Sequence, residues 1–144
     1  MSQMKIEISQ ISACTSAARL GSHCVLIDRP IEKGGTAQGP MGGELFLASV
    51  GGCFMSNILA AIRSRDENVS NVRVEVTGIL TDSSPVRYSG LELTVDADTS
   101  DRALLEHLVE IADRGCIMMN TLRGTLDLRV RVVAESPAKT LARA

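Results

Sequence analysis

The sequence predicts a single α+β domain in which antiparallel strands pack around one long apolar helix. Polar and apolar residues alternate near both ends of the chain, as in strands with one buried face. An apolar stretch with helical spacing lies between them. A chain of 144 residues can bury one hydrophobic core but is short for two. We therefore expect one domain over residues 1–144, with a polar, frayed tail at about 135–144.

The N-terminal residues predict a hairpin. Residues 4–9 alternate between apolar and polar, which favours a strand with one buried face, and residues 23–28 are its expected partner. Residues 15–22 are small and include Gly21, so we expect them to turn the chain. Arg19 would then lie near the tip of the hairpin.

A glycine-rich loop follows at residues 33–43 and resembles a phosphate-binding loop only superficially. Such a loop needs Lys-Ser/Thr after its last glycine, and Glu44-Leu45 stands there instead. A loop that approaches another part of the backbone closely, or a mobile loop, is the better interpretation.

Residues 44–65 predict a helix roughly 30 Å long, apolar on most sides, which we expect to be buried nearly all round. A membrane span is disfavoured because Ser49, Ser56 and Asn57 interrupt the apolar run and Gly51-Gly52 weakens it. One domain of this size cannot easily surround such a helix. We therefore expect a homodimer.

The second half predicts two antiparallel strands, a helix, a short helical piece and a last strand. The paired strands carry Val72 to Val76 and Leu91 to Val95 in alternation, with turn-forming residues 81–85 between them. Thr99 or Ser100 is the expected cap of the next helix, which Gly115 ends. The short helical piece runs from Cys116 to about Leu122. The last strand carries Leu126, Leu128, Val130 and Val132.

The composition excludes several classes of function. Lys and Arg number 15 against 17 Asp and Glu, so the chain has no basic field for nucleic acid or anionic lipid. The N-terminus lacks the pattern of a signal peptide, which favours the cytoplasm and reduced thiols. The four cysteines form no close pair and the two histidines add no zinc pattern, so we expect no metal or cofactor.

The most specific chemistry in the sequence is a possible pair of thiols. Cys53 lies in the apolar helix, and Cys116 follows the second helix. If they meet in space, the chain is a redox enzyme; taken alone, each could be a small buried hydrophobe. Cys14 and Cys24 could pair across the hairpin or, in a reducing compartment, remain free thiols.

Three features together resemble the OsmC/Ohr family of osmotically inducible and organic hydroperoxide resistance proteins. They are Gly39-Pro40, the run from Glu44 to Gly51-Gly52-Cys53, and Cys116 before the final strand. The resemblance covers nearly the whole chain in element order. It implies an intertwined α+β homodimer whose long helices pack together, and a thiol-dependent peroxidase that acts on organic hydroperoxides without a cofactor.

The resemblance also implies roles for four residues. Cys53 would be the peroxidatic cysteine and Cys116 the resolving one, and an external dithiol would reduce their disulfide. Arg19 would supply the cation that ionises Cys53, held by Glu44 at the start of the long helix. Glu44 precedes Cys53 by nine residues, roughly 13 Å along a helix, so it would act through Arg19 or across a second subunit.

The chain departs from the peroxidase pattern at two positions. In the peroxidases a proline usually follows the second cysteine, whereas Ile117 follows Cys116 here. Their glutamate typically stands one residue farther from the first cysteine, so Glu44 could instead be a carboxylate favoured by the helix dipole. The match is closer to the broader OsmC-like branch. A second function is therefore open: a noncatalytic module that binds a small apolar ligand in a dimer cavity.

Overall fold

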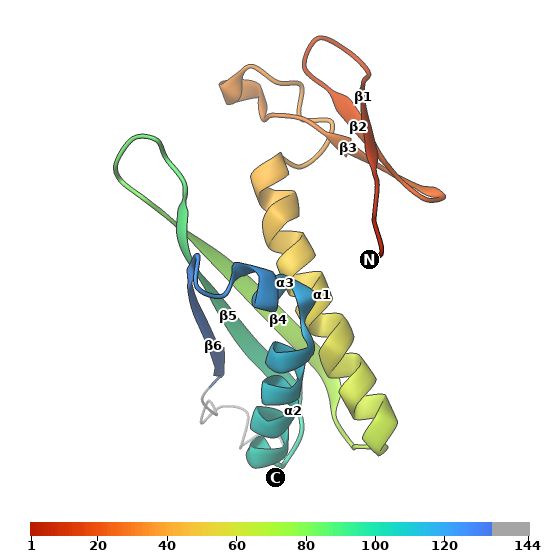
Figure 1. Ribbon diagram of the computed structural model, residues 1–144, viewed down its shortest axis with the longest axis vertical. Coiled ribbons are helices and arrows are strands. Elements are labelled where there is room, and N and C mark those ends of the chain that lie inside the picture. Colours follow the sequence, from red (N-terminus) through yellow and green to blue (C-terminus); the bar gives the residue numbers. More distant parts are fainter. Residues whose placement is uncertain (134–144) are drawn as a thin grey trace. The chain divides into compact units, whose positions relative to one another are not determined.

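The computed structural model describes residues 1–133, and the α+β class predicted from the sequence is confirmed. The chain divides into two compact units, Met1–Phe46 and a second that begins at Leu47. Each contains one three-stranded sheet (Figure 1). The single domain over residues 1–144 stays a prediction, and the expected frayed tail at 135–144 lies outside the described residues.

The sheet of the first unit corrects the expected hairpin. Its strands β1 (Glu7–Gln10), β2 (Ser16–Leu20) and β3 (His23–Ile27) are antiparallel in that order. The expectation that residues 15–22 form a turn is wrong, because most of them form the middle strand, and β3 pairs with β2 instead of with residues 4–9. Small residues favour turns, but pairing on both sides of β2 overrides that local preference.

The expected buried face of the first strand is also absent. All four residues of β1 are exposed, and Ile8 keeps 56% of its surface accessible. Alternation identified the strand but not the layer that would cover its apolar face, because that layer depends on tertiary packing.

Asp28 holds the glycine-rich loop against the end of β3. Its carboxylate accepts hydrogen bonds from the Thr36 hydroxyl at 2.6 Å and from the backbone N–H groups of Arg29, Thr36 and Gln38 at 2.7, 3.1 and 3.2 Å. These bonds, the Thr36 hydroxyl first, hold the pKa of Asp28 well below its ordinary value despite burial. A Cβ on Gly39 would stand 2.2 Å from the Leu26 carbonyl oxygen, so glycine is required there. The loop, which follows a short 3-10 helix η1 (Ile31–Lys33), is thus a close-approach loop.

Helix α1 (Gly42–Arg65) matches the predicted helix in position but not in burial. Only one stripe is fully enclosed, and the expectation of burial nearly all round is wrong for the single chain. Leu59, for example, keeps 48% of its surface accessible. Each large apolar side chain in the stripe contributes about 1.5–3 kcal/mol by leaving water. The buried residues are Val50, Phe54, Ile58 and Ala61.

Length and composition would also allow α1 to cross a membrane, alone among the helices of residues 1–133. Two of its polar side chains are satisfied by their own helix: the Ser56 hydroxyl donates to the Gly52 carbonyl and the Asn57 amide donates to the Cys53 carbonyl, both at 2.9 Å. That the helix belongs to a core and not to a bilayer stays a prediction.

The alternation predicts the three strands of the second unit correctly, but the expectation of antiparallel strands is wrong for the last of them. Strands β4 (Ser70–Leu80) and β5 (Tyr88–Asp98) are antiparallel, and β6 (Asp127–Val132) runs parallel to β5. Leu91, Leu93 and Val95 of the central strand are fully buried. Charged and polar residues occupy the alternate positions, so one face of the sheet is apolar and the other is polar.

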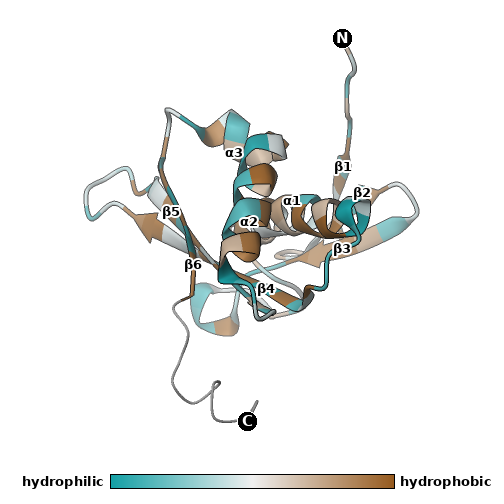
Figure 2. Cartoon of the chain, turned by 90° about the horizontal axis from the view of Figure 1, so that it is seen from below, coloured by the Kyte–Doolittle hydropathy of each residue, from teal (hydrophilic) through white to brown (hydrophobic). Residues whose placement is uncertain are grey.

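Two helices follow β5 and complete the layer on the apolar face. They are α2 (Arg102–Gly115) and the short α3 (Ile117–Leu122). Figures 1 and 2 show α2 lying beside α1 on the same side of the β4–β6 sheet. Gly51 brings α1 close to that sheet, since a Cβ there would stand 2.8 Å from a methyl group of Val76.

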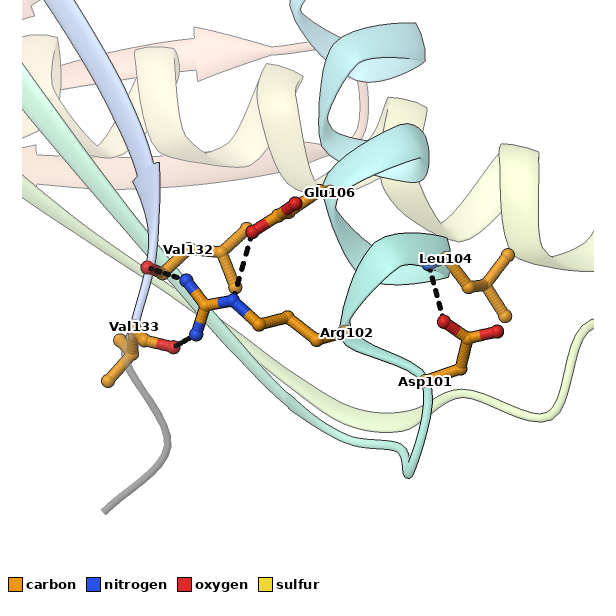
Figure 3. Close-up of polar contacts among 6 residues, drawn as sticks. All are labelled: Asp101, Arg102, Leu104, Glu106, Val132 and Val133. Carbon is orange, nitrogen blue, oxygen red and sulfur yellow. Dashed lines mark hydrogen bonds and ion pairs between the residues drawn. The ribbon is translucent and has the colours of Figure 1, made fainter.

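Helix α2 has its N-cap one or two residues later than expected. Asp101 is its N-cap, in place of Thr99 or Ser100, and the Asp101 carboxylate accepts from the Leu104 N–H at 2.9 Å. Arg102 then donates to the carbonyl oxygens of Val132 and Val133 and pairs with the Glu106 carboxylate (Figure 3). These bonds fix the start of α2 to the end of β6.

Candidate functional site

The fold brings Cys53 and Cys116 together although 63 residues separate them. The Cys116 thiol donates a hydrogen bond to the Cys53 sulfur, with the two Sγ atoms 3.0 Å apart. Both are free cysteines; Cys116 is fully buried and Cys53 is half-buried. The sulfur separation is that of two thiols in contact, about 1 Å longer than a disulfide bond.

Cys116 reaches this position because the chain bends at Gly115–Cys116, which we call the elbow between α2 and α3. Cys116 has extended backbone angles and serves both as the C-cap of α2 and as the N-cap of α3. The Asn120 amide donates to the Arg114 carbonyl at 2.9 Å, and Arg123 contacts both carboxylate oxygens of Asp113 at 3.0 Å. Side chains of α3 and its C-cap therefore hold the elbow closed.

The surroundings of the two sulfurs shift the pKa values of the two thiols in opposite directions. Burial raises the pKa of the Cys53 thiol, but hydrogen bonds from the Met118 N–H, the Cys116 thiol and the Ile117 N–H outweigh it and leave the pKa below its ordinary value. Burial and the bond to Cys53 raise the pKa of the Cys116 thiol. Cys53 is thus the sulfur that ionises first, and Cys116 retains its proton to donate.

The residue after Cys116 supplies one of these donors. Proline has no N–H, so the proline usual in the hydroperoxidases could not bond to the Cys53 sulfur from this position. Ile117 is 74% exposed, and its backbone N–H helps to lower the pKa of the Cys53 thiol. The departure from the peroxidase pattern therefore changes the electrostatics of the first cysteine.

Arg19 lies in the first unit, at the next-to-last residue of β2 and close to the Gly21–Ser22 turn that joins β2 to β3. It stands between Glu7 on β1 and Cys24 on β3, and its side chain is exposed. The expected loop position is wrong because residues 16–20 form a strand. Its role as the cation beside Cys53 stays a prediction.

Glu44 caps the helix that carries Cys53. Its carboxylate accepts a hydrogen bond from the Met41 N–H at 2.7 Å, the backward bond of a capping box. This contact is the one expected if Glu44 is a carboxylate that stabilises the start of the helix. Its action on Arg19 or across a second subunit stays a prediction.

The remaining cysteines do not form the pair that the hairpin suggested. Cys14 donates to the Thr36 hydroxyl at 3.7 Å, and Cys24 is an exposed free thiol. Within residues 1–133, no group of three or more His, Cys, Asp or Glu side chains is placed to hold a metal ion.

An apolar groove of about 440 Å³ lies between α1 and β4. Cys53 is two residues from both Gly51 and Met55, which line the groove, and two residues rotate a helix position by about 200°. The groove therefore opens on the side of α1 away from the thiol pair. Its lining residues are Leu47, Ala48, Gly51, Gly52, Met55, Val74 and Val76.

Solved structures share this fold at low sequence identity. An organic hydroperoxide resistance protein OsmC from Legionella pneumophila is 19% identical, with a TM-score of 0.72 over 93% of this chain and 100% of that one. The organic hydroperoxide resistance protein OhrB of Bacillus subtilis is 20% identical, with a TM-score of 0.68 over 90% of this chain and 96% of that one. An OsmC-like protein of unknown function from Vibrio cholerae is 14% identical, with a TM-score of 0.76 over 92% of this chain and 100% of that one. At these identities the likeness concerns the fold alone.

The sequence itself matches a family profile over most of its length. No curated protein sequence matches the chain. The profile of the OsmC-like proteins, however, covers residues 35–131, which include both cysteines of the site and the second sheet except for the last residue of β6. The chain therefore belongs to the OsmC-like protein family.

Proposed function

We propose that the protein is a thiol peroxidase that reduces organic hydroperoxides through Cys53 and Cys116. The observation that carries this proposal is the contact between the two sulfurs at 3.0 Å, in which one thiol is more acidic than usual and the other less so. A peroxidatic cysteine must be a thiolate, and its partner must lie close enough to form a disulfide. The family of the chain includes redox proteins of this kind.

In the first step the Cys53 thiolate attacks one oxygen of the hydroperoxide. The O–O bond breaks, Cys53 becomes a sulfenic acid, and the second oxygen leaves as an alkoxide that takes up a proton to form the alcohol. The hydrogen bonds from Ile117 and Met118 stabilise the thiolate before the attack. The Cys116 thiol, still protonated, is the nearest sulfur that can follow.

In the second step Cys116 attacks the sulfenic sulfur of Cys53. An S–S bond forms, the S–O bond breaks, and the departing hydroxyl takes the Cys116 proton and leaves as water. An external dithiol then reduces the disulfide by thiol–disulfide exchange and restores both thiols. We propose that this reduction takes place in the cytoplasm, where dithiol reductants are maintained.

The residues beside the thiols favour an organic peroxide over hydrogen peroxide. Apolar residues follow both cysteines in the sequence: Phe54 and Met55 follow Cys53, and Ile117 and Met118 follow Cys116. An alkyl or acyl group gains free energy by leaving water there, whereas hydrogen peroxide gains none. Arg19, supported by Glu44, is the cation proposed to complete the site.

The native chain should consume cumene hydroperoxide in the presence of dithiothreitol, and should consume hydrogen peroxide at least about tenfold more slowly, the factor expected for burying a few carbon atoms. The measurement is the loss of peroxide over time at equal concentrations of the two oxidants. Failure to consume either peroxide above the rate of the reductant alone would refute the proposed function.

We also propose that the chain works as a homodimer in which a second copy covers the exposed side of α1. Ala48, Gly52 and Leu59 fall on one stripe of that helix and are exposed in the single chain. A stripe of small and apolar residues on a long helix is suited to helix–helix packing.

Sedimentation should therefore give twice the chain mass of 15.3 kDa. Leu59→Asp should shift the equilibrium toward the single chain, because it would bury a carboxylate in the interface. Val86→Asp, at an exposed apolar residue between β4 and β5, serves as the matched control. A native chain that sediments as a monomer at micromolar concentration would contradict the dimer.

The groove between α1 and β4 supports a second candidate function, a noncatalytic module that binds a small apolar ligand. Its volume and apolar lining suit such a ligand. The two candidates differ in what Cys53 does. A binding module would retain a fluorescent fatty acid equally well with Cys53 intact or replaced by serine, and neither form would consume peroxide.

A further inference from the structure

Asn57 contacts both α1, which carries Cys53, and the elbow, which carries Cys116. It follows Cys53 by one helical turn, and its amide nitrogen donates to the Cys53 carbonyl oxygen at 2.9 Å. That bond fixes the rotation of the carboxamide. Its oxygen then points at Gly115, the residue immediately before Cys116.

Gly115 lies directly against this carboxamide. A Cβ on Gly115 would stand 2.9 Å from the Asn57 amide oxygen, closer than van der Waals contact allows. Its backbone has no positive φ that would itself require glycine. The absence of a side chain at 115 therefore has a packing explanation: it lets the elbow approach α1 as far as the Asn57 carboxamide.

We propose that Asn57 is a positioning residue that, with Gly115, sets the distance at which the elbow presents Cys116 and the Ile117 and Met118 N–H groups to the Cys53 sulfur. The elbow is rigid on its own side, through Asn120 and Arg123. The distance between the elbow and α1 has to be set by a further contact. The Asn57 carboxamide of α1 makes this contact at Gly115, one residue before Cys116.

The inference rests on the proposed function, because close approach matters most in the resolving step. The two sulfurs must close from 3.0 Å to the length of a disulfide bond while water departs. A displacement of about 1 Å can slow a reaction between positioned groups by a large factor. Asn57 would thus govern the second step of the cycle more than the first.

The test uses Asn57→Ser, a substitution that repeats the side chain of the neighbouring Ser56. The Ser56 hydroxyl bonds to the carbonyl four residues earlier at 2.9 Å, so a serine at 57 can keep the bond to Cys53 and the helix intact. It is too short to reach Gly115. Ser56→Ala is the control for the helix itself: it removes, at an exposed position of α1, a hydroxyl-to-carbonyl bond of the kind that Asn57→Ser is expected to keep.

The readout is the equilibrium between the Cys53–Cys116 disulfide and a glutathione redox buffer, which gives the effective concentration of one thiol at the other. Asn57→Ser should lower it roughly tenfold, and Ser56→Ala should leave it unchanged. Gly115→Ala should also lower it, because its methyl group collides with the carboxamide. The double variant Asn57→Ser/Gly115→Ala should recover most of the loss, because the methyl group fills the vacated space.

An Asn57→Ser variant that matches the native chain, or a double variant whose loss is the product of the two single losses, would overturn the inference. Because this equilibrium needs no peroxide, it is independent of the assay of the proposed function. If the native chain consumes no hydroperoxide but the variants behave as described, the proposed peroxidase fails and the positioning by Asn57 stands. If the native chain consumes hydroperoxide but the variants do not behave as described, the proposed peroxidase stands and the role of Asn57 is refuted.

Discussion

Replacing Cys53 by serine is expected to reduce hydroperoxide consumption to the rate of the reductant alone. A serine hydroxyl is not ionised near neutral pH and cannot form a sulfenic acid, so both steps of the cycle are lost. The side chain is half-buried and similar in volume to serine, so the fold should persist. The assay is cumene hydroperoxide with dithiothreitol, and a Cys53→Ser variant as fast as the native chain would refute the mechanism.

Cys116→Ser separates the two steps and serves as the comparison. Cys53 would still be oxidised once, but no resolving thiol would follow, so the sulfenic acid should persist and react with dimedone. The alternative assignment, with Cys116 as the nucleophile, predicts the opposite pattern: dimedone would label Cys116 in the Cys53→Ser variant. Cys14→Ser should behave like the native chain, because Cys14 contacts Thr36 in the first unit.

Ile117→Pro is expected to raise the pKa of the Cys53 thiol and to slow its reaction at neutral pH by about fivefold to tenfold. The substitution removes one N–H donor from the sulfur, and one hydrogen bond accounts for a factor of this size. Proline is suited to the first residue of a helix, and Cys116 has the extended angles that precede proline. The thiolate absorbance near 240 nm, followed against pH, measures the change directly.

The sign of this pH dependence follows from the direction of the pKa. In the native chain the Cys53 pKa lies below that of an ordinary thiol, so the thiolate forms, and the rate rises, at a lower pH. In Ile117→Pro the same rise should move to higher pH. Ile117→Ala is the control: it loses the exposed side chain and retains the N–H. Equal titrations for proline and alanine would show that the Ile117 N–H does not stabilise the thiolate.

Much of the second unit could be predicted because its periodicity is reinforced by burial. The alternation over β4, β5 and β6 corresponds to one apolar and one polar face of a real sheet. The first unit could not be predicted in the same way. Its middle strand contains Ala17, Ala18 and Arg19, which carry no strong strand preference, and pairing with both neighbours determines its conformation.

The candidate site, too, could be predicted from the sequence only in part. The approach of Cys53 to Cys116 was left open by the residues themselves and was implied by the family resemblance. The donors to the Cys53 sulfur were not expected, because backbone N–H groups leave no signal in a sequence. The one available clue was the missing proline at Ile117, which frees a donor. Asn57 was noted only as an interruption of an apolar run, since its contact with Gly115 depends on how α2 ends beside α1.

The most direct test of the thiol pair is a peptide mass spectrum of the native chain after one equivalent of cumene hydroperoxide. We predict one major product, in which a disulfide links the Cys53 peptide to the Cys116 peptide and Cys14 and Cys24 remain free thiols. Addition of dithiothreitol should restore all four thiols. Cys53 oxidised to the sulfinic or sulfonic acid while Cys116 stays a free thiol, or no change in either peptide, would contradict the claim that these two sulfurs form one redox centre.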